Sequence, residues 1–191
     1  MARRKDHTRE ELRELAIEQG TELVRADGVA ALTARNVAKA IGYTPGTLYN
    51  IFENIQGLVA AINARTLQGL ASDIEAQIQR CKTPESKLKR ICQLYLDLQT
   101  AEPKLCTLIF ATPLENMTED FGTAVHAVFD QVTEAIRPLC KNDAAARQDA
   151  KIIWSTLHGI CLLHQNGKLD VTEPDPPEQL VKRFLAQFLD R

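Results

Sequence analysis

Five neighbouring residues are suited to contact with DNA: Thr44, Gly46, Thr47, Tyr49 and Asn50. The amide of Asn50 can hydrogen-bond to two positions on the edge of adenine, and Thr47 can hydrogen-bond to a base or touch a thymine methyl group. Tyr49 offers a hydroxyl suited to a phosphate, and Gly46 lets the backbone approach closely. We expect Thr47 and Asn50 to contact base edges; the alternative is that Asn50 is only a solvated helix residue.

The chain around this group predicts two short helices joined by a tight turn, over residues 33–52. Val37, Ala38 and Ile41 share one face of the first helix, and Ala38 is small enough for a second helix to cross it closely. Gly42 then stands where a helix commonly ends in a left-handed residue. This spacing is typical of a helix-turn-helix.

The second helix of the pair has its own start and packing signals. Thr44 is expected to cap it through the side-chain hydroxyl, and Pro45 occupies the first helical position. Leu48 and Phe52 are spaced i, i+4 and form its inward-facing pair. The polar residues on the opposite face would therefore point into a DNA major groove.

Contacts with the phosphate backbone are expected from residues outside this second helix. The first nine residues hold four basic side chains against one acidic one, so they could form an arm that reaches the minor groove or the phosphates; a solubilising, disordered terminus is the alternative. The residues expected to contact DNA here are Arg3, Arg4, Lys5, Thr33 and Arg35.

Helical periodicity predicts an all-α chain of about nine helices, without alternating strand patterns or internal repeats. Thr8 and Glu11 form a capping box before the first helix, and Thr83 with Pro84 opens the fifth. The fourth helix is expected to have a break near Gly69. Outside the helix-turn-helix, the expected helices cover residues 9–26, 54–81, a stretch from 84, 103–111, 118–139, 143–165 and a last one from 178.

Composition argues against several classes of protein. The 23 basic and 25 acidic side chains nearly balance, so bulk positive charge does not drive binding to nucleic acid. The five cysteines fit neither a zinc pattern nor a disulfide framework, and the histidines form no ligand-spaced cluster, so we expect no metal and no cofactor. The absence of a membrane-spanning run and of a signal peptide predicts a cytoplasmic protein without a membrane partner. No nucleophile motif, phosphate loop or carboxylate pair suggests an enzyme.

The segment Leu32–Phe52, LTARNVAKAIGYTPGTLYNIF, resembles the DNA-binding signature of the tetracycline-repressor (TetR) family of transcriptional regulators. The capped helix before it and the long helical stretch behind it are arranged as in that family. The resemblance implies a DNA-binding domain over residues 1–54 and a ligand-binding and dimerisation domain over residues 55–191. Trp154, His158 and Gly159 are also similar to a W-x3-H-G element found in one class of these C-terminal domains.

The resemblance further implies a homodimer built from the last two helices of each subunit. The double apolar stripe of the last helix is wide enough to pack on its own bundle and on a partner; a monomeric amphipathic helix is the alternative. The residues expected at the dimer interface are Ile160, Leu163, Leu180, Val181, Phe184 and Phe188.

A small ligand is expected to bind among aromatic and histidine side chains of the C-terminal domain. Trp154 and His158 lie four residues apart on one helix face, and plain core packing is the alternative for both. A pocket of this composition suits a small hydrophobic or aromatic molecule. The residues expected to line it are Tyr95, Phe110, His126, Phe129, Trp154 and His158.

The sequence therefore predicts a ligand-responsive, homodimeric repressor that binds a palindromic or pseudo-palindromic operator. Ile51 and Ile55 depart from the family, which often has a polar or basic phosphate-contacting residue at both positions. Each missing phosphate contact lowers the salt slope of binding by about 0.9, so we expect modest salt dependence. These two residues keep a second interpretation open, namely a helical ligand-binding or interaction module that has lost specific DNA binding.

Overall fold

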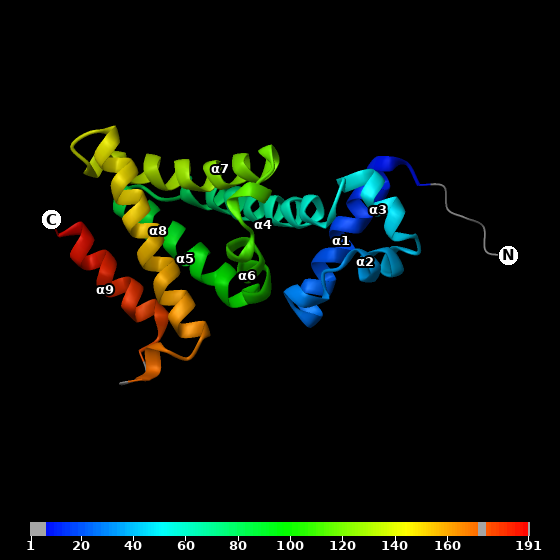
Figure 1. Cartoon of the computed structure of the whole chain (residues 1–191). Coiled ribbons are helices and arrows are strands. Elements are labelled where there is room, and N and C mark those ends of the chain that lie inside the picture. Colours follow the sequence, from blue (N-terminus) through cyan, green and yellow to red (C-terminus); the bar gives the residue numbers. More distant parts are fainter. Residues whose placement is uncertain (1–6, 172–174, 191) are drawn as a thin grey trace. The chain divides into compact units, whose positions relative to one another are not determined.

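The structure is a computed structural model, and it describes residues 7–171 and 175–190. Over these ranges the chain forms nine α-helices and no β-strand (Figure 1). The predicted all-α fold is therefore confirmed. The helices begin and end within a few residues of the positions that their capping and periodicity signals predict.

The first helix, α1 (Arg9–Asp27), begins at the predicted capping box. The Thr8 hydroxyl accepts from the backbone N–H of Glu11 at 3.2 Å, and the Glu11 carboxylate accepts from the N–H of Thr8 at 2.7 Å. These bonds satisfy two of the backbone donors that a helix start leaves unpaired. The hydrogen bond from the Thr8 N–H, followed by the contribution of the Thr8 side chain, lowers the pKa of the Glu11 carboxyl, because donors stabilise its charged form.

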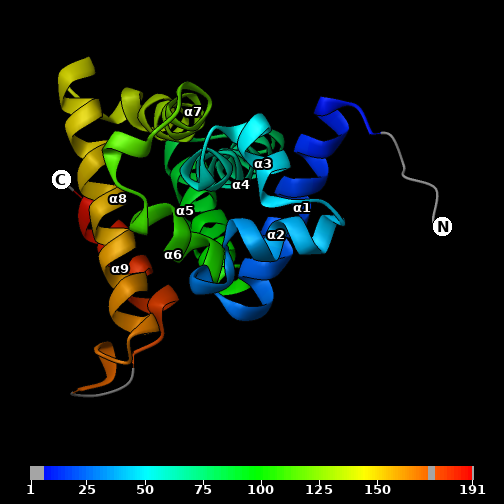
Figure 2. The same cartoon turned by 45° about the vertical axis from the view of Figure 1, so that its right-hand side comes forward.

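The two helices of the helix-turn-helix are α2 (Ala34–Ile41) and α3 (Pro45–Phe52). Gly42 ends α2 with φ at 79°, in the left-handed region that glycine adopts at no steric cost. Val37 and Ala38 are almost fully buried against α1 and α3. The turned view of Figure 2 again places α2 and α3 against α1.

The fourth helix, α4 (Ile55–Ile78), runs without interruption through Gly69, so the predicted break there is wrong. A single glycine costs an α-helix about 1 kcal/mol relative to alanine, which the buried apolar residues of this long helix easily outweigh. Contacts divide the chain into two compact units, and α4 belongs to both, with the change at residues 66 and 67. The first unit holds residues 1–66 and 104–123; the second holds residues 67–103 and 124–191.

In the first compact unit, α6 (Pro103–Ala111) packs beside the helix-turn-helix core through Leu105 and Leu108. The Lys104 ammonium donates to the carbonyls of Arg25 and Ala26 at 2.9 and 2.6 Å. A cation on the last carbonyls of a helix complements the negative end of its dipole. Lys104 therefore joins α6 to the C-terminal end of α1.

The second compact unit is a bundle of α5 (Pro84–Ala101), α7 (Glu119–Ile136) from residue 124 onward, α8 (Asp143–Gln165) and α9 (Pro177–Leu189), with the second half of α4. In Figures 1 and 2, α5, α8 and α9 lie side by side. Leu88, Ile136 and Ile153 are among its fully buried side chains. Within the described ranges, no helix has both the length and the apolar character needed to cross a bilayer.

The predicted functional division at residues 54 and 55 stays a prediction. The first compact unit extends further along the chain than residue 54. The first half of α4, and α6 from Lys104 onward, pack with the N-terminal helices. The compact unit that contains the helix-turn-helix is therefore larger than the DNA-binding domain predicted from the sequence.

Candidate nucleic-acid interface and effector site

The recognition helix α3 has one buried and one exposed face. Leu48 and Phe52 are 3% and 8% exposed and pack into the core of the first compact unit. Tyr49 is 48% exposed, and Asn50 is exposed beside it. The i, i+4 spacing of the buried pair thus turns the polar side chains outward, as a helix that enters a groove requires.

The start of α3 differs from the prediction. Thr44 has the extended backbone of an N-cap residue, but its side chain makes no capping hydrogen bond. The N–H of Thr47 donates instead to the carbonyl of Thr44 at 3.0 Å, and the two threonine hydroxyls lie 3.2 Å apart. The predicted side-chain cap is therefore wrong, because the Thr44 hydroxyl pairs with the Thr47 hydroxyl.

Gly46 occupies an open position at this end of α3. A Cβ atom added there would meet only the Thr44 hydroxyl, at an ordinary contact distance of 3.7 Å. The fold itself does not need glycine at this position. The missing side chain instead leaves room outside the protein, consistent with the close backbone approach expected for Gly46.

Helix α1 supports α3 through two arginines: Arg9, which the sequence pattern counted in the basic N-terminal arm, and Arg13, which it did not single out. The Arg9 guanidinium donates to the backbone carbonyl of Asn50 at 3.2 Å. Arg13 lies over the ring of Phe52, 5.9 Å from its centroid, within the range of a cation–π contact. Both contacts hold the C-terminal half of the recognition helix without using its outward side chains.

The residues expected to contact phosphate surround this helix. Thr33 is exposed and caps α2, accepting from the N–H of Asn36 at 3.2 Å, and Arg35 is exposed in the first turn of α2. The arm residues Arg3, Arg4 and Lys5 lie outside the described part of the chain. The first described residue, His7, lies 2.9 Å from the Tyr43 hydroxyl through Nδ1, which ties the base of the arm to the turn between α2 and α3.

The two isoleucines that depart from the family pattern have a structural role. Ile51 and Ile55 are half-buried and pack against the core of the first compact unit. An apolar side chain at these places adds buried surface and offers no donor to a phosphate. At both positions the chain thus has packing where the family resemblance leads us to expect a phosphate contact.

In the second compact unit, three of the six predicted ligand residues meet. The Tyr95 hydroxyl lies 3.1 Å from Nδ1 of His158, and the rings of Trp154 and His158 are stacked with centroids 6.2 Å apart. The amide nitrogen of Gln99 donates to the Tyr95 oxygen at 2.9 Å.

His158 is held in its neutral form. Burial lowers the pKa of its imidazole, because removing a group from water disfavours the charged state. In a neutral ring, Nδ1 can also accept a hydrogen bond from the Tyr95 hydroxyl. The aromatic cluster of Tyr95, Trp154 and His158 is therefore uncharged, and its Trp154 and His158 rings are stacked.

The other three predicted ligand residues do not join this cluster. Phe129 packs partly buried against the core of the second compact unit, and His126 is exposed on α7. Phe110 belongs to the first compact unit, where it is 41% exposed. Their assignment to a ligand site stays a prediction.

The residues expected at the dimer interface fall into two groups. Leu163 is 43% exposed, and Ile160, Leu180 and Phe184 are half-buried. In contrast, Val181 and Phe188 are only 3% and 6% exposed, because the inner stripe of α9 packs into the core of its own bundle. The structure therefore assigns Val181 and Phe188 to the core, where they offer a partner almost no surface.

Helix α8 adds exposed apolar residues that the sequence reasoning did not single out. Ile152 and Leu162 are 45% and 46% exposed. At 100° per residue, they lie with Leu163 on the side of α8 away from its buried residues. Gly159 is on the same side, and a Cβ atom built there would meet no atom within 4 Å. This apolar face is defined here as Ile152, Gly159, Leu162 and Leu163.

The geometry defines a helix-turn-helix DNA-binding protein with a helical C-terminal bundle. Residues 16–62 match the family model of bacterial regulatory proteins of the tetR family, and residues 88–188 match the model of the tetracyclin repressor-like C-terminal domain. The second match alone covers more than half of the chain. The chain belongs to the TetR family of transcriptional regulators.

Solved structures share the fold over nearly the full chain. A protein with unknown function from Rhodococcus sp. RHA1 is 20% identical, with a TM-score of 0.78, and the match covers 98% of this chain and 97% of that one. The regulator FadR from Bacillus subtilis, in complex with stearoyl-CoA, is 16% identical, with a TM-score of 0.71 and coverages of 92% and 97%. Thermus thermophilus FadR, in complex with lauroyl-CoA, is 18% identical, with a TM-score of 0.68 and coverages of 93% and 92%. Curated protein sequences include no match to this chain.

Proposed function

We propose that this protein is a homodimeric repressor that binds a two-fold-symmetric operator and releases it when a small ligand binds. The observation that carries the proposal is the exposed polar face of α3, held from behind by Arg9 and Arg13, in a chain of the TetR family. A dimer would place two such helices in successive major grooves, about 34 Å apart. Thr47 and Asn50 contact base edges, while Thr33, Thr44, Arg35, Tyr49 and the N-terminal arm contact phosphates.

The dimer interface in this proposal is the apolar face of α8 together with Leu180 and Phe184 of α9. Exposed apolar residues gathered on one side of a helix are typical of association surfaces. Because a two-fold axis brings the same face of both subunits together, each residue of this face occurs twice in the interface. Val181 and Phe188 support this interface from within the bundle.

The ligand is proposed to be hydrophobic. The aromatic cluster is uncharged, and two structures of similar fold contain acyl-CoA molecules, lauroyl-CoA and stearoyl-CoA. A long-chain acyl thioester is therefore the first candidate. Such a ligand releases DNA only if it binds the non-operator conformation more tightly than the operator-bound one. We place this activity in the cytoplasm, and we assign the protein no catalytic step.

Selection of bound fragments from a random DNA pool tests the proposal. The purified protein should enrich a two-fold-symmetric sequence at near-physiological salt. The selected operator is then titrated with lauroyl-CoA, with coenzyme A lacking the acyl chain as the control. Release of the operator by lauroyl-CoA but not by coenzyme A supports a hydrophobic effector. Failure to enrich any sequence would contradict the regulator and favour the interaction module.

A further inference from the structure

The recognition helix α3, with the sequence PGTLYNIF, contains no charged side chain. Ile51 within it and Ile55 at the start of α4 offer no donor to a phosphate either. An element that enters the major groove is nevertheless flanked by the phosphates of both strands, and cations beside it supply much of the affinity for DNA. The positive charge around α3 must therefore come from neighbouring segments of the chain.

His7 lies beside the turn that leads into α3. Its Nδ1 is 2.9 Å from the hydroxyl oxygen of Tyr43, and the two rings are tilted by 58° with their centroids 6.0 Å apart. Tyr43 is itself fixed, because its backbone N–H donates to the carbonyl of Ala38 at 2.8 Å and its side chain packs against the core of the first compact unit. The imidazole is therefore held at the turn that ends in Thr44, directly before α3.

The same short segment also contacts the far part of the recognition helix. Arg9, two residues after His7, donates to the carbonyl of Asn50 at 3.2 Å. His7 thus contacts the turn before α3, and Arg9 contacts the C-terminal half of α3. Residues 7–9 therefore run alongside the recognition helix and lie where the protein borders the groove.

The second ring nitrogen of His7 can reach a ligand. Within residues 7–171 and 175–190, Nε2 of His7 has no hydrogen-bond partner, and the side chain is partly exposed. In a protonated imidazole both ring nitrogens are donors, so Nδ1 donates to the Tyr43 oxygen while Nε2 donates outward. Histidine is also the side chain that ordinarily changes its charge between pH 5 and 8. A phosphate beside this ring would therefore meet a donor whose charge depends on pH.

The ionisable groups near His7 leave its charge available to a phosphate. Glu11 is bonded in the capping box and interacts electrostatically with His7, and Glu10 lies 4.0 Å from the guanidinium of Arg13. Asp6 lies outside the described residues. The other ionisable side chains of the adjoining segments are basic or uncharged: Arg9, Arg35, Lys39, Tyr43 and Tyr49.

We propose that His7 contacts a phosphate beside the start of α3 and takes up a proton when the protein binds its operator, with Nε2 as the donor to a phosphate oxygen. A nearby phosphate favours the protonated ring, so the complex binds this proton more tightly than the free protein does. Lowering the pH therefore favours the complex. The inference rests on the proposed operator binding and adds to it a contact residue and a pH dependence.

Affinity for the selected operator, measured by fluorescence anisotropy at pH 6 and pH 8 over a series of salt concentrations, tests the proposal. At fixed salt, affinity should be at least about fivefold higher at pH 6, since both subunits of the dimer take up a proton. The salt slope should also be steeper at pH 6, by up to about 1.8, because each subunit gains one phosphate contact worth about 0.9. A residue that only supports the fold would not change this slope.

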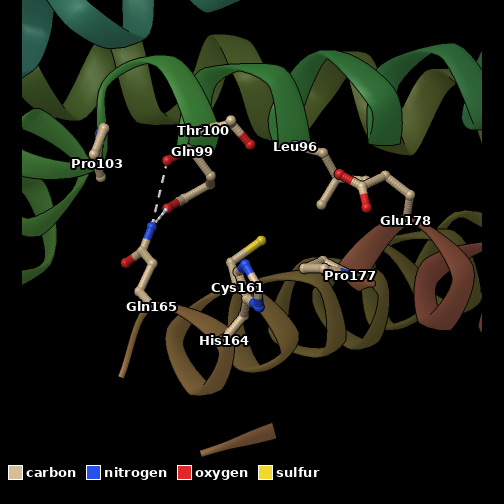
Figure 3. A pocket seen from close by; sticks show the side chains of 9 residues that line it. All are labelled: Leu96, Gln99, Thr100, Pro103, Cys161, His164, Gln165, Pro177 and Glu178. Atoms are coloured by element: carbon tan, nitrogen blue, oxygen red, sulfur yellow. Dashed lines mark hydrogen bonds between the residues drawn. The ribbon is translucent and has the colours of Figure 1, made fainter. Parts of the chain in front are cut away.

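Two variants and a matched control assign the effect to His7. His7→Gln keeps a polar partner for Tyr43 but cannot change its charge, so its affinities at the two pH values should agree within about twofold. Tyr43→Phe keeps the ring and removes the hydroxyl that holds Nδ1, and it should reduce the pH response although His7 is still present. His164→Gln should keep the full response, because His164 is exposed at the end of α8, where it lines a cavity of the second compact unit (Figure 3).

The inference is overturned if the affinity of the unmodified protein does not rise toward pH 6, or if its salt slope is the same at both pH values. It is also overturned if His7→Gln responds to pH as the unmodified protein does; an unchanged response in Tyr43→Phe has the same meaning should His7→Gln fail to fold. In each of these cases the operator is still bound, so the proposed repressor stands. Absence of operator binding at both pH values would overturn the repressor and this inference together.

Discussion

At the scale of single residues, the proposal assigns base recognition above all to Asn50. Truncation in Asn50→Ala removes the amide but keeps the backbone carbonyl that Arg9 contacts, so α3 stays supported. We expect a loss of about 1–3 kcal/mol on the selected operator and a much smaller loss on operators altered at the contacted base pair. Fluorescence anisotropy across such operators measures this. Tyr49→Phe is the control and should weaken all operators alike; the same pattern for Asn50→Ala would exclude base reading.

Gly57, in the first turn of α4, is a residue whose importance only the structure reveals. A Cβ atom there would lie 2.3 Å from the carbonyl oxygen of Phe52, the last residue of α3. Gly57→Ala must therefore shift the end of the recognition helix, and we expect it to lower the free energy of unfolding by about 3 kcal/mol or to abolish operator binding.

A second glycine of the same helix provides the control for this change. At Gly69 an added Cβ atom would meet nothing within 4 Å, so Gly69→Ala should raise stability by about 0.5–1 kcal/mol. Urea unfolding measures both variants. Equal effects of the two substitutions would show that the close approach of Gly57 to Phe52 is unimportant.

His158 links stability to pH. Because burial lowers the pKa of its imidazole in the folded protein, the unfolded chain binds the proton more tightly, near its ordinary pKa of about 6.5. The stabilising effect is present above that value and is lost as the pH falls below it. His158→Gln removes this titration while keeping an acceptor for Tyr95. Between pH 7.5 and 5, the melting temperature should thus fall less in the variant than in the unmodified protein. An identical fall in both would contradict the role of His158 in the pH dependence.

At the scale of elements, local signals predicted most of the secondary structure. Thr8 and Glu11, and Thr83 with Pro84, mark helix starts through bonds within four residues, so they can be recognised without knowledge of the fold. The apolar i, i+4 spacing likewise predicted the inward face of α3. The Thr44 cap failed because a hydroxyl has several nearby partners, and its choice depends on the geometry of the turn.

The parts that could not be predicted depend on residues far apart in the sequence. Arg9 reaches a carbonyl of α3, and Lys104 reaches carbonyls at the end of α1. Backbone carbonyls are present in every residue, so the sequence contains no mark of these contacts. The two stripes of α9 are equally apolar in sequence, and the side facing its own bundle is determined by packing against α5 and α8. That is why the sequence could not show that Val181 and Phe188 are buried in their own bundle.

The apolar face of α8 is an element-scale feature with a direct test. Leu163 is half exposed, so Leu163→Glu should fold, but a two-fold interface would bury two new charges. We expect the dissociation constant of the dimer to rise at least about 30-fold, measured by sedimentation velocity. Leu114→Glu makes the same change at a residue that is 81% exposed and should leave the dimer intact. An intact dimer in Leu163→Glu would place the interface elsewhere.

At the scale of the whole molecule, specificity comes from two recognition helices acting together. Each α3 contacts only a few base pairs. The dimer binds both half-sites at once when their separation matches the groove repeat. Affinity for the full operator should thus far exceed that for a half-site, since the second head binds at a high effective concentration once the first is bound. This link between dimer geometry and DNA affinity is also what an effector would have to change.

The most direct measurement is the affinity of the protein for its selected operator before and after about five base pairs are inserted between the half-sites. This insertion rotates one half-site to the opposite face of the duplex without altering any contacted base. The account predicts that binding falls to the level of a single half-site, and that insertion of a full turn restores part of it. Unchanged affinity after the half-turn insertion would contradict a rigid dimer that reads two successive major grooves.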